Sequence, residues 1–209
     1  MPDRLLKSSD GLRRCFWCGA DPLYVAYHDS EWGQPVADDR RLFEKLVLEG
    51  FQAGLSWITI LRKRENFRSA FDDFDIEKVA RYNERRIARL LGNPGIVRHR
   101  GKIESAINNA KRASQLVDEA GSIAAFLWRY EPPPASRPKK LTWDVLSTMS
   151  TTRESTALSK DLKRRGWTFV GPTTMYAAMQ AMGVVNDHLH GCAHRDQAER
   201  ARAAFNRPV

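Results

Sequence analysis

The chain has 209 residues, of which 42% are hydrophobic, and this is enough apolar material for one sizeable core. Lys and Arg number 34 against 25 Asp and Glu, so the net charge is +9, a composition typical of nucleic-acid-binding proteins but also of a solvated basic surface. No stretch approaches the roughly 20 apolar residues of a membrane span, and residues 1–14 lack a signal-peptide core, so we expect a cytoplasmic protein without a membrane partner.

Apolar residues at helical spacing are the main structural signal along the chain. Residues 1–14 are polar and charged, and we expect a disordered N-terminal tail there. Asp38 starts a helix, Ser56 caps a second and Asp75 caps a third, each followed by an apolar stripe. A turn over Gly92–Gly95 precedes another helix. Further helices are expected over residues 121–130, 155–165 and 173–182. Since no stretch alternates convincingly like a strand, the predicted fold class is all-α.

Metal-type ligands lie in two clusters near the ends of the chain. All three cysteines and four of the five histidines are there: Cys15, Cys18 and His28 in the first cluster, and His188–His194 with Cys192 in the second. Zinc prefers thiolate and imidazole, and four of them form a closed structural site. In a reducing compartment, three cysteines are expected to form a metal site or to remain free thiols, and disulfides are less favoured. A metal bound by both clusters would join the two ends of the chain.

Two blocks in the first third combine aromatic rings with carboxylates. Residues 21–33 contain Tyr24 and Tyr27, and residues 48–57 contain Glu49 and Trp57 around two glycines. A single aromatic residue is most often part of a core, and a single Glu at a helix end is most often exposed. A Glu beside several rings can, however, accept hydrogen bonds from a flat, cationic, aromatic ligand.

A third block begins at the glycine-rich turn and continues with basic residues. Arg98, Arg100 and Lys102 follow Gly95 at the start of a predicted helix. The free amides of a helix N-terminus attract phosphate, and the basic side chains add positive charge. The pattern is typical of a sequence-independent contact with the DNA backbone, although a run of charges is also the usual composition of a solvated helix face.

Taken together, these blocks resemble the 3-methyladenine DNA glycosylase I (Tag) family from about Arg14 to Cys192. The motifs that carry the resemblance are Asp21-Pro22-Leu23-Tyr24, Tyr27-His28-Asp29, Glu31-Trp32-Gly33, Glu49-Gly50, Gln52-Ala53-Gly54-Leu55-Ser56-Trp57, Arg62 to Asn66, Arg98 to Ile103, Phe169-Val170-Gly171, Val185-Asn186-Asp187-His188 and Gly191-Cys192. Because so many matches occur in order, the resemblance is specific.

The resemblance implies an all-α, helix-hairpin-helix DNA glycosylase. It implies one domain over residues 15–192, with the helix-hairpin-helix region at about 87–112 and a C-terminal tail over 193–209. The expected reaction is hydrolysis of the N-glycosidic bond of 3-methyladenine in alkylated double-stranded DNA, after the base is flipped out of the helix. The enzyme is expected to be monofunctional and monomeric, and to leave an abasic site and free 3-methyladenine.

The resemblance also assigns the residues of the base pocket and of the DNA contact. Glu49 is the expected catalytic residue, Tyr27 and Trp57 are the expected stacking residues, and Trp17 and Tyr24 lie nearby. The DNA-intercalating edge maps onto Gly54 and Leu55. The hairpin contacts map onto Gly95, Arg98, Arg100 and Lys102.

The family's zinc pattern, Cys…His…His-x-x-x-Cys, maps onto Cys15, His28, His188 and Cys192. Spacing alone favours Cys18 in place of His28, because Cys15-x-x-Cys18 has the spacing of a zinc knuckle. The zinc is expected to be structural, since protein ligands fill all four positions. His190 and His194 lie outside the pattern and are expected to be solvated.

Two functions of other classes compete with this interpretation. A DNA-binding zinc module without catalysis would leave the cluster of aromatic rings and Glu49 unexplained. A zinc hydrolase would need an open coordination position on the metal. A metal with four protein ligands has no such position, so finding one would exclude the hydrolase.

Overall fold

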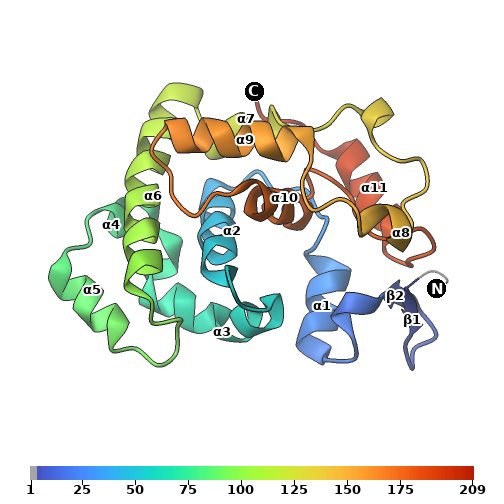
Figure 1. The fold of residues 1–209 in the computed structure, drawn as a ribbon, viewed down its shortest axis with the longest axis horizontal. Coiled ribbons are helices and arrows are strands. Elements are labelled where there is room, and N and C mark those ends of the chain that lie inside the picture. The colour runs from blue at the N-terminus through green and yellow to red at the C-terminus, as the bar shows by residue number, and fades with distance from the viewer. Residues whose placement is uncertain (1–3) are drawn as a thin grey trace.

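A computed structural model of the protein describes residues 4–209, and its centre is the buried helix α2 (Figure 1). Helix α2 runs over Asp39–Gln52, and all of Leu46–Phe51 is buried. Four helices pack against it: α3 (Trp57–Ala70), α6 (Arg100–Ala120), α7 (Ile123–Trp128) and α10 (Pro172–Ala181). A helix surrounded in this way carries apolar residues on most of its faces, and any polar side chain on it has few routes to solvent.

The fold is mostly helical, as predicted. The remaining helices are α1 (Pro22–Ser30), α4 (Ile76–Ala80), α5 (Glu84–Leu91), α8 (Trp143–Leu146), α9 (Arg153–Arg164) and α11 (Arg195–Ala204), with 3-10 turns over Phe16–Cys18, Asp72–Phe74 and Pro134–Ser136. No helix within residues 4–209 is long and apolar enough to cross a membrane.

The helix starts show which local signals were reliable. The carboxylate of Asp38 accepts a hydrogen bond from the Arg41 amide at 2.8 Å, and that of Asp75 accepts one from Lys78 at 3.1 Å, as predicted. Ser56 does precede α3, but its hydroxyl is 2.7 Å from that of Thr59 and caps no amide.

The expectation that the chain has no strand, with a disordered tail before residue 15, is wrong for the residues described. Strands β1 (Leu5–Lys7) and β2 (Arg13–Cys15) form an antiparallel hairpin in which Leu5 is paired with Cys15. Residues 1–3 lie outside the described part. The strands are too short to show alternation, and tertiary contacts order them: Arg14 is buried, and Leu5 packs against the cluster formed by Cys15, Leu189 and Cys192.

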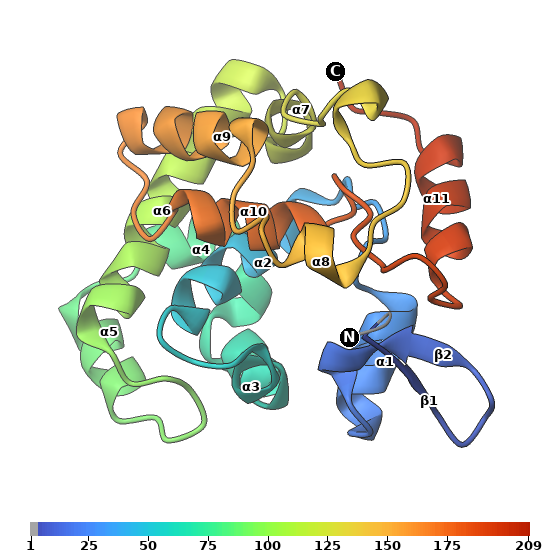
Figure 2. The same cartoon turned by 45° about the vertical axis from the view of Figure 1, so that its right-hand side comes forward.

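The N-terminal hairpin and helix α11, near the C-terminus, lie on one side of the molecule. Both views place the hairpin, α1 and α11 together at the end away from α5 and α6 (Figures 1 and 2). The amide of Ala193 donates to the carbonyl of Arg13 at 2.9 Å, so the contact between the ends includes the backbone. Helix α11 occupies part of the segment 193–209 that was expected to be a tail.

Candidate functional site

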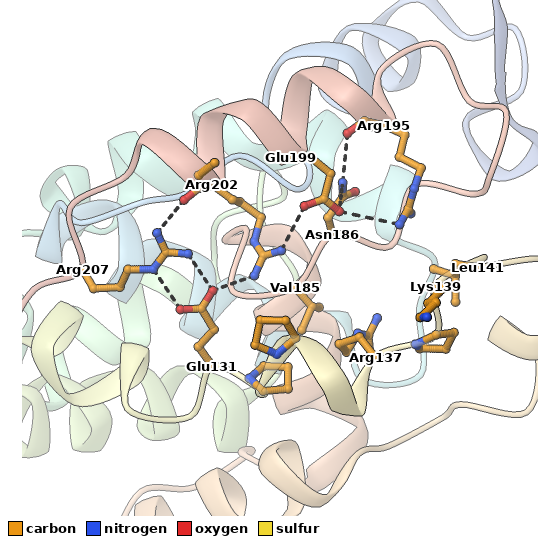
Figure 3. A pocket seen from close by; sticks show the side chains of 14 residues that line it. Glu131, Arg137, Lys139, Leu141, Val185, Asn186, Arg195, Glu199, Arg202 and Arg207 are labelled. Carbon is orange, nitrogen blue, oxygen red and sulfur yellow. Dashed lines mark hydrogen bonds and ion pairs between the residues drawn. The ribbon is translucent and has the colours of Figure 1, made fainter.

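One cavity, of about 330 Å³, lies between the proline-rich loop after α7 and helix α11 (Figure 3). Its carboxylates are already bound by arginines: Glu131 accepts from Arg202 at 2.7 Å and from Arg207 at 2.8 Å. None of the described residues that line it is aromatic. This cavity therefore offers paired charges and proline rings, and it contains none of the residues that the sequence assigned to a site.

A second pocket, of about 210 Å³, contains all five residues predicted for the base pocket. It lies where α1, α2, α3, α8 and α10 meet. The lining residues are Trp17, Tyr24, Tyr27, Trp32, Glu49, Gln52, Trp57, Leu146, Ala177 and Gln180. Glu49 is the carboxylate of this set, and five of the other residues supply aromatic rings. Such a pocket suits a flat aromatic ligand.

Helix α1 positions one wall of the pocket. The Asp21 carboxylate caps this helix by accepting from the amides of Leu23 and Tyr24, at 3.0 and 3.2 Å. Tyr24 and Tyr27, three residues apart, then share one face. The ring of Tyr27 is 5.5 Å from that of Trp57 between centroids, and the ring of Trp17 is 5.1 Å from that of Tyr24. The rings therefore support one another and leave the space between them free for a ligand.

The carboxylate of Glu49 is nearly enclosed. Its residue is 5% exposed, and burial raises its pKa to about 7, although the neighbouring Lys45 opposes this shift. Burial in turn lowers the pKa of Lys45 to about 8. Groups with pKa values moved toward neutrality by burial are concentrated in functional sites, because charge there can be gained or lost near pH 7.

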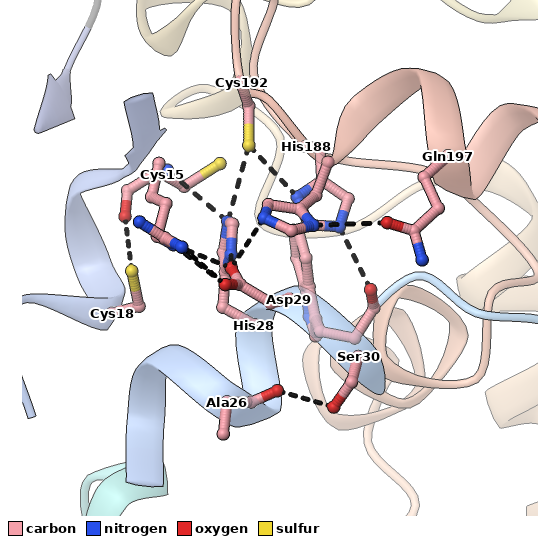
Figure 4. A network of polar contacts seen from close by, with 12 residues as sticks. Cys15, Cys18, Ala26, His28, Asp29, Ser30, His188, Cys192 and Gln197 are labelled. Carbon is pink, nitrogen blue, oxygen red and sulfur yellow. Dashed lines mark hydrogen bonds and ion pairs between the residues drawn. The ribbon is translucent and has the colours of Figure 1, made fainter. Parts of the chain in front are cut away.

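The four predicted metal ligands come together beside this pocket (Figure 4). Cys15, His28, His188 and Cys192 are all buried, and their ligand atoms lie within 4.8 Å of one another. Cys18 is not part of the group, because its Sγ points to the Cys15 carbonyl oxygen, 3.1 Å away. Of the two ligand sets that the sequence left open, the structure brings together the one that contains His28.

Both imidazoles are held in the orientation that a metal ion requires. The Nδ1 atom of His28 is 2.7 Å from the Asp29 carboxylate, and the Nε2 atom of His188 is 3.0 Å from the Trp32 carbonyl oxygen. Because the outer nitrogen donates its N–H to these acceptors, the inner nitrogen of each ring presents a lone pair toward Cys192 Sγ, at 3.6 and 3.5 Å. The arrangement fits a tetrahedral metal ion with two thiolates and two imidazoles.

Asp29 connects the metal ligands to the N-terminal hairpin. Its carboxylate accepts from the Nε and Nη2 atoms of Arg14, at 2.9 and 2.8 Å, and lies 3.1 Å from Nε2 of His194. The expectation that His194 is solvated is wrong, since its side chain is 16% exposed and faces Asp29. His190 is exposed, as expected. Arg14 and Asp29 had no assigned role, and only their proximity to ligand residues could have indicated one.

The predicted metal ligands also contact the aromatic pocket. The ring of Trp17 lies 5.1 Å from that of His28, and the ring of Trp32 lies 4.8 Å from that of His188. Two residues of the pocket wall, Trp17 and Trp32, are therefore packed directly on His28 and His188, two of the predicted metal ligands.

The residues predicted to contact DNA are divided between the α2–α3 loop and the segment formed by the turn before α6 and the first residues of α6. Leu55 is 41% exposed in the loop that joins α2 to α3, and Gly54 beside it has a φ of +80°, which favours glycine. Arg98 is exposed before α6, next to the turn that contains Gly95. Arg100 is paired with Glu84 and Glu104, at 3.2 and 3.0 Å.

Lys102 has a different environment from the one predicted. It is 8% exposed, and its ammonium donates to the carbonyl oxygens of Phe51 and Ala53, at 2.9 and 2.5 Å. These carbonyls end α2, where a cation is favourable. The lysine therefore holds the loop that carries Leu55 and is not available to phosphate, a difference that the spacing of charges could not reveal.

Known proteins resemble the chain in both sequence and structure. A sequence model described as methyladenine glycosylase matches residues 17–196, which is most of the chain. The chain belongs to the methyladenine glycosylase family. It is 48% identical, over 182 residues, to DNA-3-methyladenine glycosylase 1 of Escherichia coli (strain K12), and the match covers 87% of this chain and 96% of that protein.

Members of the family with solved structures also share this fold. A crystal structure of 3-methyladenine DNA glycosylase I superposes with a TM-score of 0.78 and 47% identity, covering 86% of this chain and 98% of that one. A tyrosine-to-phenylalanine variant of 3-methyladenine DNA glycosylase I, solved in complex with 3-methyladenine, gives a TM-score of 0.79 and 40% identity, covering 87% and 97%.

Several pocket residues were not predicted from the sequence. Trp32, Gln52, Ala177 and Gln180 all line the pocket. Gln180 lies far along the chain and reaches the pocket only because α10 packs on α2. Trp32 lay inside a motif of the family resemblance, and its position four residues after His28 was a signal that could have placed it beside the pocket.

Proposed function

We propose that the protein hydrolyses the N-glycosidic bond of 3-methyladenine in alkylated double-stranded DNA and releases the free base. The observation that carries the proposal is the enclosure of one carboxylate, Glu49, among aromatic rings in a pocket of about 210 Å³. The names of the relatives support it, since they are DNA-3-methyladenine glycosylases and one of them was solved with 3-methyladenine bound.

The chemistry suits a pocket of this kind. 3-Methyladenine attached to deoxyribose is positively charged, and its bond to C1′ is weak because the departing base takes the bonding electrons and becomes neutral. Water adds to C1′ and loses a proton, which leaves an abasic deoxyribose. The enzyme therefore needs little acid catalysis on the leaving group. Tyr27 and Trp57 stack on the cationic ring, an attraction of about 0.5–2 kcal/mol for each ring.

Glu49 supplies selectivity in this proposal. As a carboxylate it accepts hydrogen bonds from the edge of the flipped base and attracts its positive charge. A neutral base that cannot donate to it would leave a buried carboxylate unpaired, which is unfavourable. Flipping itself costs a few kcal/mol, and these contacts in the pocket offset that cost.

The loops beside the pocket are the proposed DNA contact. Leu55 is an exposed apolar side chain on the α2–α3 loop, suited to fill the gap that a flipped base leaves. Helix α5, the turn containing Gly95 and the start of α6 form the proposed helix-hairpin-helix, where Arg98 and Arg100 approach the phosphates. Lys102 is not part of this proposed contact, because its ammonium is hydrogen-bonded to the carbonyl oxygens of Phe51 and Ala53.

The proposed metal is zinc in a structural role. Cys15, His28, His188 and Cys192 would hold it, and it would supply a rigid link between the ends of the chain and no reactive coordination position. The donor set supports the choice, because two thiolates with two imidazoles suit zinc better than magnesium or calcium. A monomer that acts in the cytoplasm is the accompanying proposal.

Base release from methylated DNA tests the proposal. Wild type is expected to release 3-methyladenine but not 7-methylguanine, and Glu49→Gln is expected to lose at least tenfold in rate while keeping its fold, because the amide carries no charge. Chromatography of the released bases measures both. Glu77→Gln, an exposed change on α4, is the matched control and should match wild type. Normal turnover by Glu49→Gln would contradict the assigned role.

A further inference from the structure

Lys45 lies one helical turn before Glu49, behind the aromatic wall of the pocket. Its Nζ atom donates to the Tyr27 hydroxyl at 3.0 Å. The same atom is 4.6 Å from the centroid of the Tyr27 ring and 4.3 Å from that of Trp57. Lys45 does not line the pocket itself. It lines a neighbouring hollow with Glu31, Arg64 and other residues.

The charges around this ammonium come from three helices. Glu44 and Glu49 belong to α2, Glu31 follows α1, and Arg64 belongs to α3. Glu31 is bound by Arg64 at 2.6 and 2.9 Å, and Glu44 by Arg68 at 2.9 Å. Glu49 has no such arginine, and Lys45 is the one charged group that acts on it appreciably among the described residues. Glu49, one helical turn after Lys45 on α2, is therefore the carboxylate of this set that no arginine neutralises.

A cation at this place is unexpected in a pocket for a cationic base. The ammonium lies against the two rings that would stack on the base, so it competes for their electron density and repels the ligand. A side chain that weakens binding in this way needs a compensating effect. The arrangement offers two effects: a fixed Tyr27 ring, and a lower cost of keeping Glu49 ionised in a buried place.

We propose that Lys45 is a positioning residue that fixes Tyr27 and keeps Glu49 negatively charged, so that the pocket selects a cationic base near neutral pH. The inference rests on the proposed function, because it assumes that ionised Glu49 binds the base.

The pH dependence follows from the two titrations. Glu49 has a raised pKa of about 7, so its charge, and with it base release, is lost as the pH falls through that value. Without Lys45 the pKa of Glu49 rises further, because an opposite charge no longer opposes burial. Above about pH 8 Lys45 is itself neutral in wild type, so its influence on Glu49 ends there. Removing Lys45 is therefore expected to slow base release at acidic and neutral pH and to leave it unchanged above about pH 8.

The test is the pH profile of 3-methyladenine release by wild type and Lys45→Met, measured between pH 5.5 and 9.5. The acid limb is expected near pH 7 in wild type and about one unit higher in Lys45→Met, with about tenfold slower release at pH 6. At pH 9 the two rates are expected to agree within about twofold. A uniform loss at every pH, or two superimposable profiles, would overturn the proposal.

Three variants separate the charge of Lys45 from its shape. Lys45→Arg keeps the positive charge and should restore the acid limb, and its failure to do so would overturn the electrostatic role. Tyr27→Phe removes the hydrogen bond but not the ammonium, so it should leave the acid limb in place. Lys111→Met, an exposed change on α6, should match wild type.

A direct measurement of Glu49 does not depend on turnover. The side-chain carboxyl carbon of Glu49, followed by NMR in labelled protein, should titrate about one unit higher in Lys45→Met than in wild type. Lys45→Gln replaces Lys45→Met if the methionine variant does not fold. If wild type releases no 3-methyladenine at any pH, the proposed function fails. If wild type is active and the Glu49 titration does not move, only the role of Lys45 fails.

Discussion

At the scale of single residues, burial determines what each side chain of the pocket can do. Glu49 and Lys45 are ordinary charged residues in the sequence, and on a solvated helix they would form a weak i, i+4 pair. Inside the fold the pKa of one is raised to about 7 and that of the other is lowered to about 8. The rings of Tyr27 and Trp57 lie against the ammonium of Lys45 and line the pocket that contains Glu49, so the charge of each group depends on the other.

The stacking role of Tyr27 can be tested by the binding of free 3-methyladenine. Tyr27→Leu removes the ring and is expected to weaken binding by about 2–30-fold, which corresponds to about 0.5–2 kcal/mol. Tyr27→Phe retains the ring and should change the dissociation constant by less than about threefold. Calorimetric titration of the folded variants measures both constants. Equal losses in the two variants would mean that the hydroxyl, and not the ring, makes the contact.

At the scale of elements, two loops define the face that we propose for DNA. The α2–α3 loop presents Leu55, and the end of α2 is held there by Lys102. Lys63 of α3 donates to the carbonyl oxygen of Pro94 at 3.0 Å. The turn before α6 is therefore joined to α3, the helix that follows the α2–α3 loop. The two loops therefore keep a fixed spacing, which a contact spanning a flipped base and the adjacent phosphates requires.

Arg98→Ala should weaken DNA binding at all sequences and reduce the slope of log affinity against log salt by about one unit, because one phosphate contact is lost. Fluorescence anisotropy over a salt series gives the slope. Arg200→Ala, an exposed change on α11, should leave it unaltered. A salt slope equal to that of wild type would show that Arg98 does not contact phosphate.

Lys102→Met is expected to act through stability. The variant leaves the carbonyls of Phe51 and Ala53 without their charged donor, so the free energy of unfolding should fall by about 1–3 kcal/mol. Urea unfolding measures this loss. The salt slope of DNA binding should stay unchanged, and a reduced slope with full stability would instead support the phosphate contact predicted from the sequence.

At the scale of the whole molecule, the four predicted metal ligands join segments more than 150 residues apart. Cys15 and His28 come from the start of the chain, and His188 and Cys192 from its end. Trp17 and Trp32 extend the contact into the pocket. Loss of the metal is therefore expected to loosen both the closure of the chain and one wall of the pocket.

Cys192→Ser should lower the bound zinc well below one ion per chain. It should also lower the melting temperature by about 10 °C, since a loss of a few kcal/mol shifts a domain of this size by that amount. Metal analysis and a thermal scan measure the two effects. Cys18→Ser is the matched control: its thiol is buried but outside the ligand group, so its zinc content should stay full. An unchanged melting point in Cys192→Ser with full zinc would contradict the structural role.

The sequence by itself determined the local features and the family. The carboxylates of Asp38 and Asp75 start helices because capping depends only on nearby amides, and the helical spacing of apolar residues needs no tertiary information. The ligand set and the pocket residues followed from the family resemblance, and the structure brings both groups together.

The environments of the remaining residues were decided by the tertiary structure alone, because local sequence patterns do not determine burial or long-range contacts. The hairpin before residue 16 forms on the C-terminal segment, and Lys102 turns inward to carbonyls 49 and 51 residues away. His194 faces Asp29, although its neighbour His190 is exposed. The charge states of Lys45 and Glu49 likewise depend on the rings of Tyr27 and Trp57 that pack beside them. No spacing in the sequence indicates this packing.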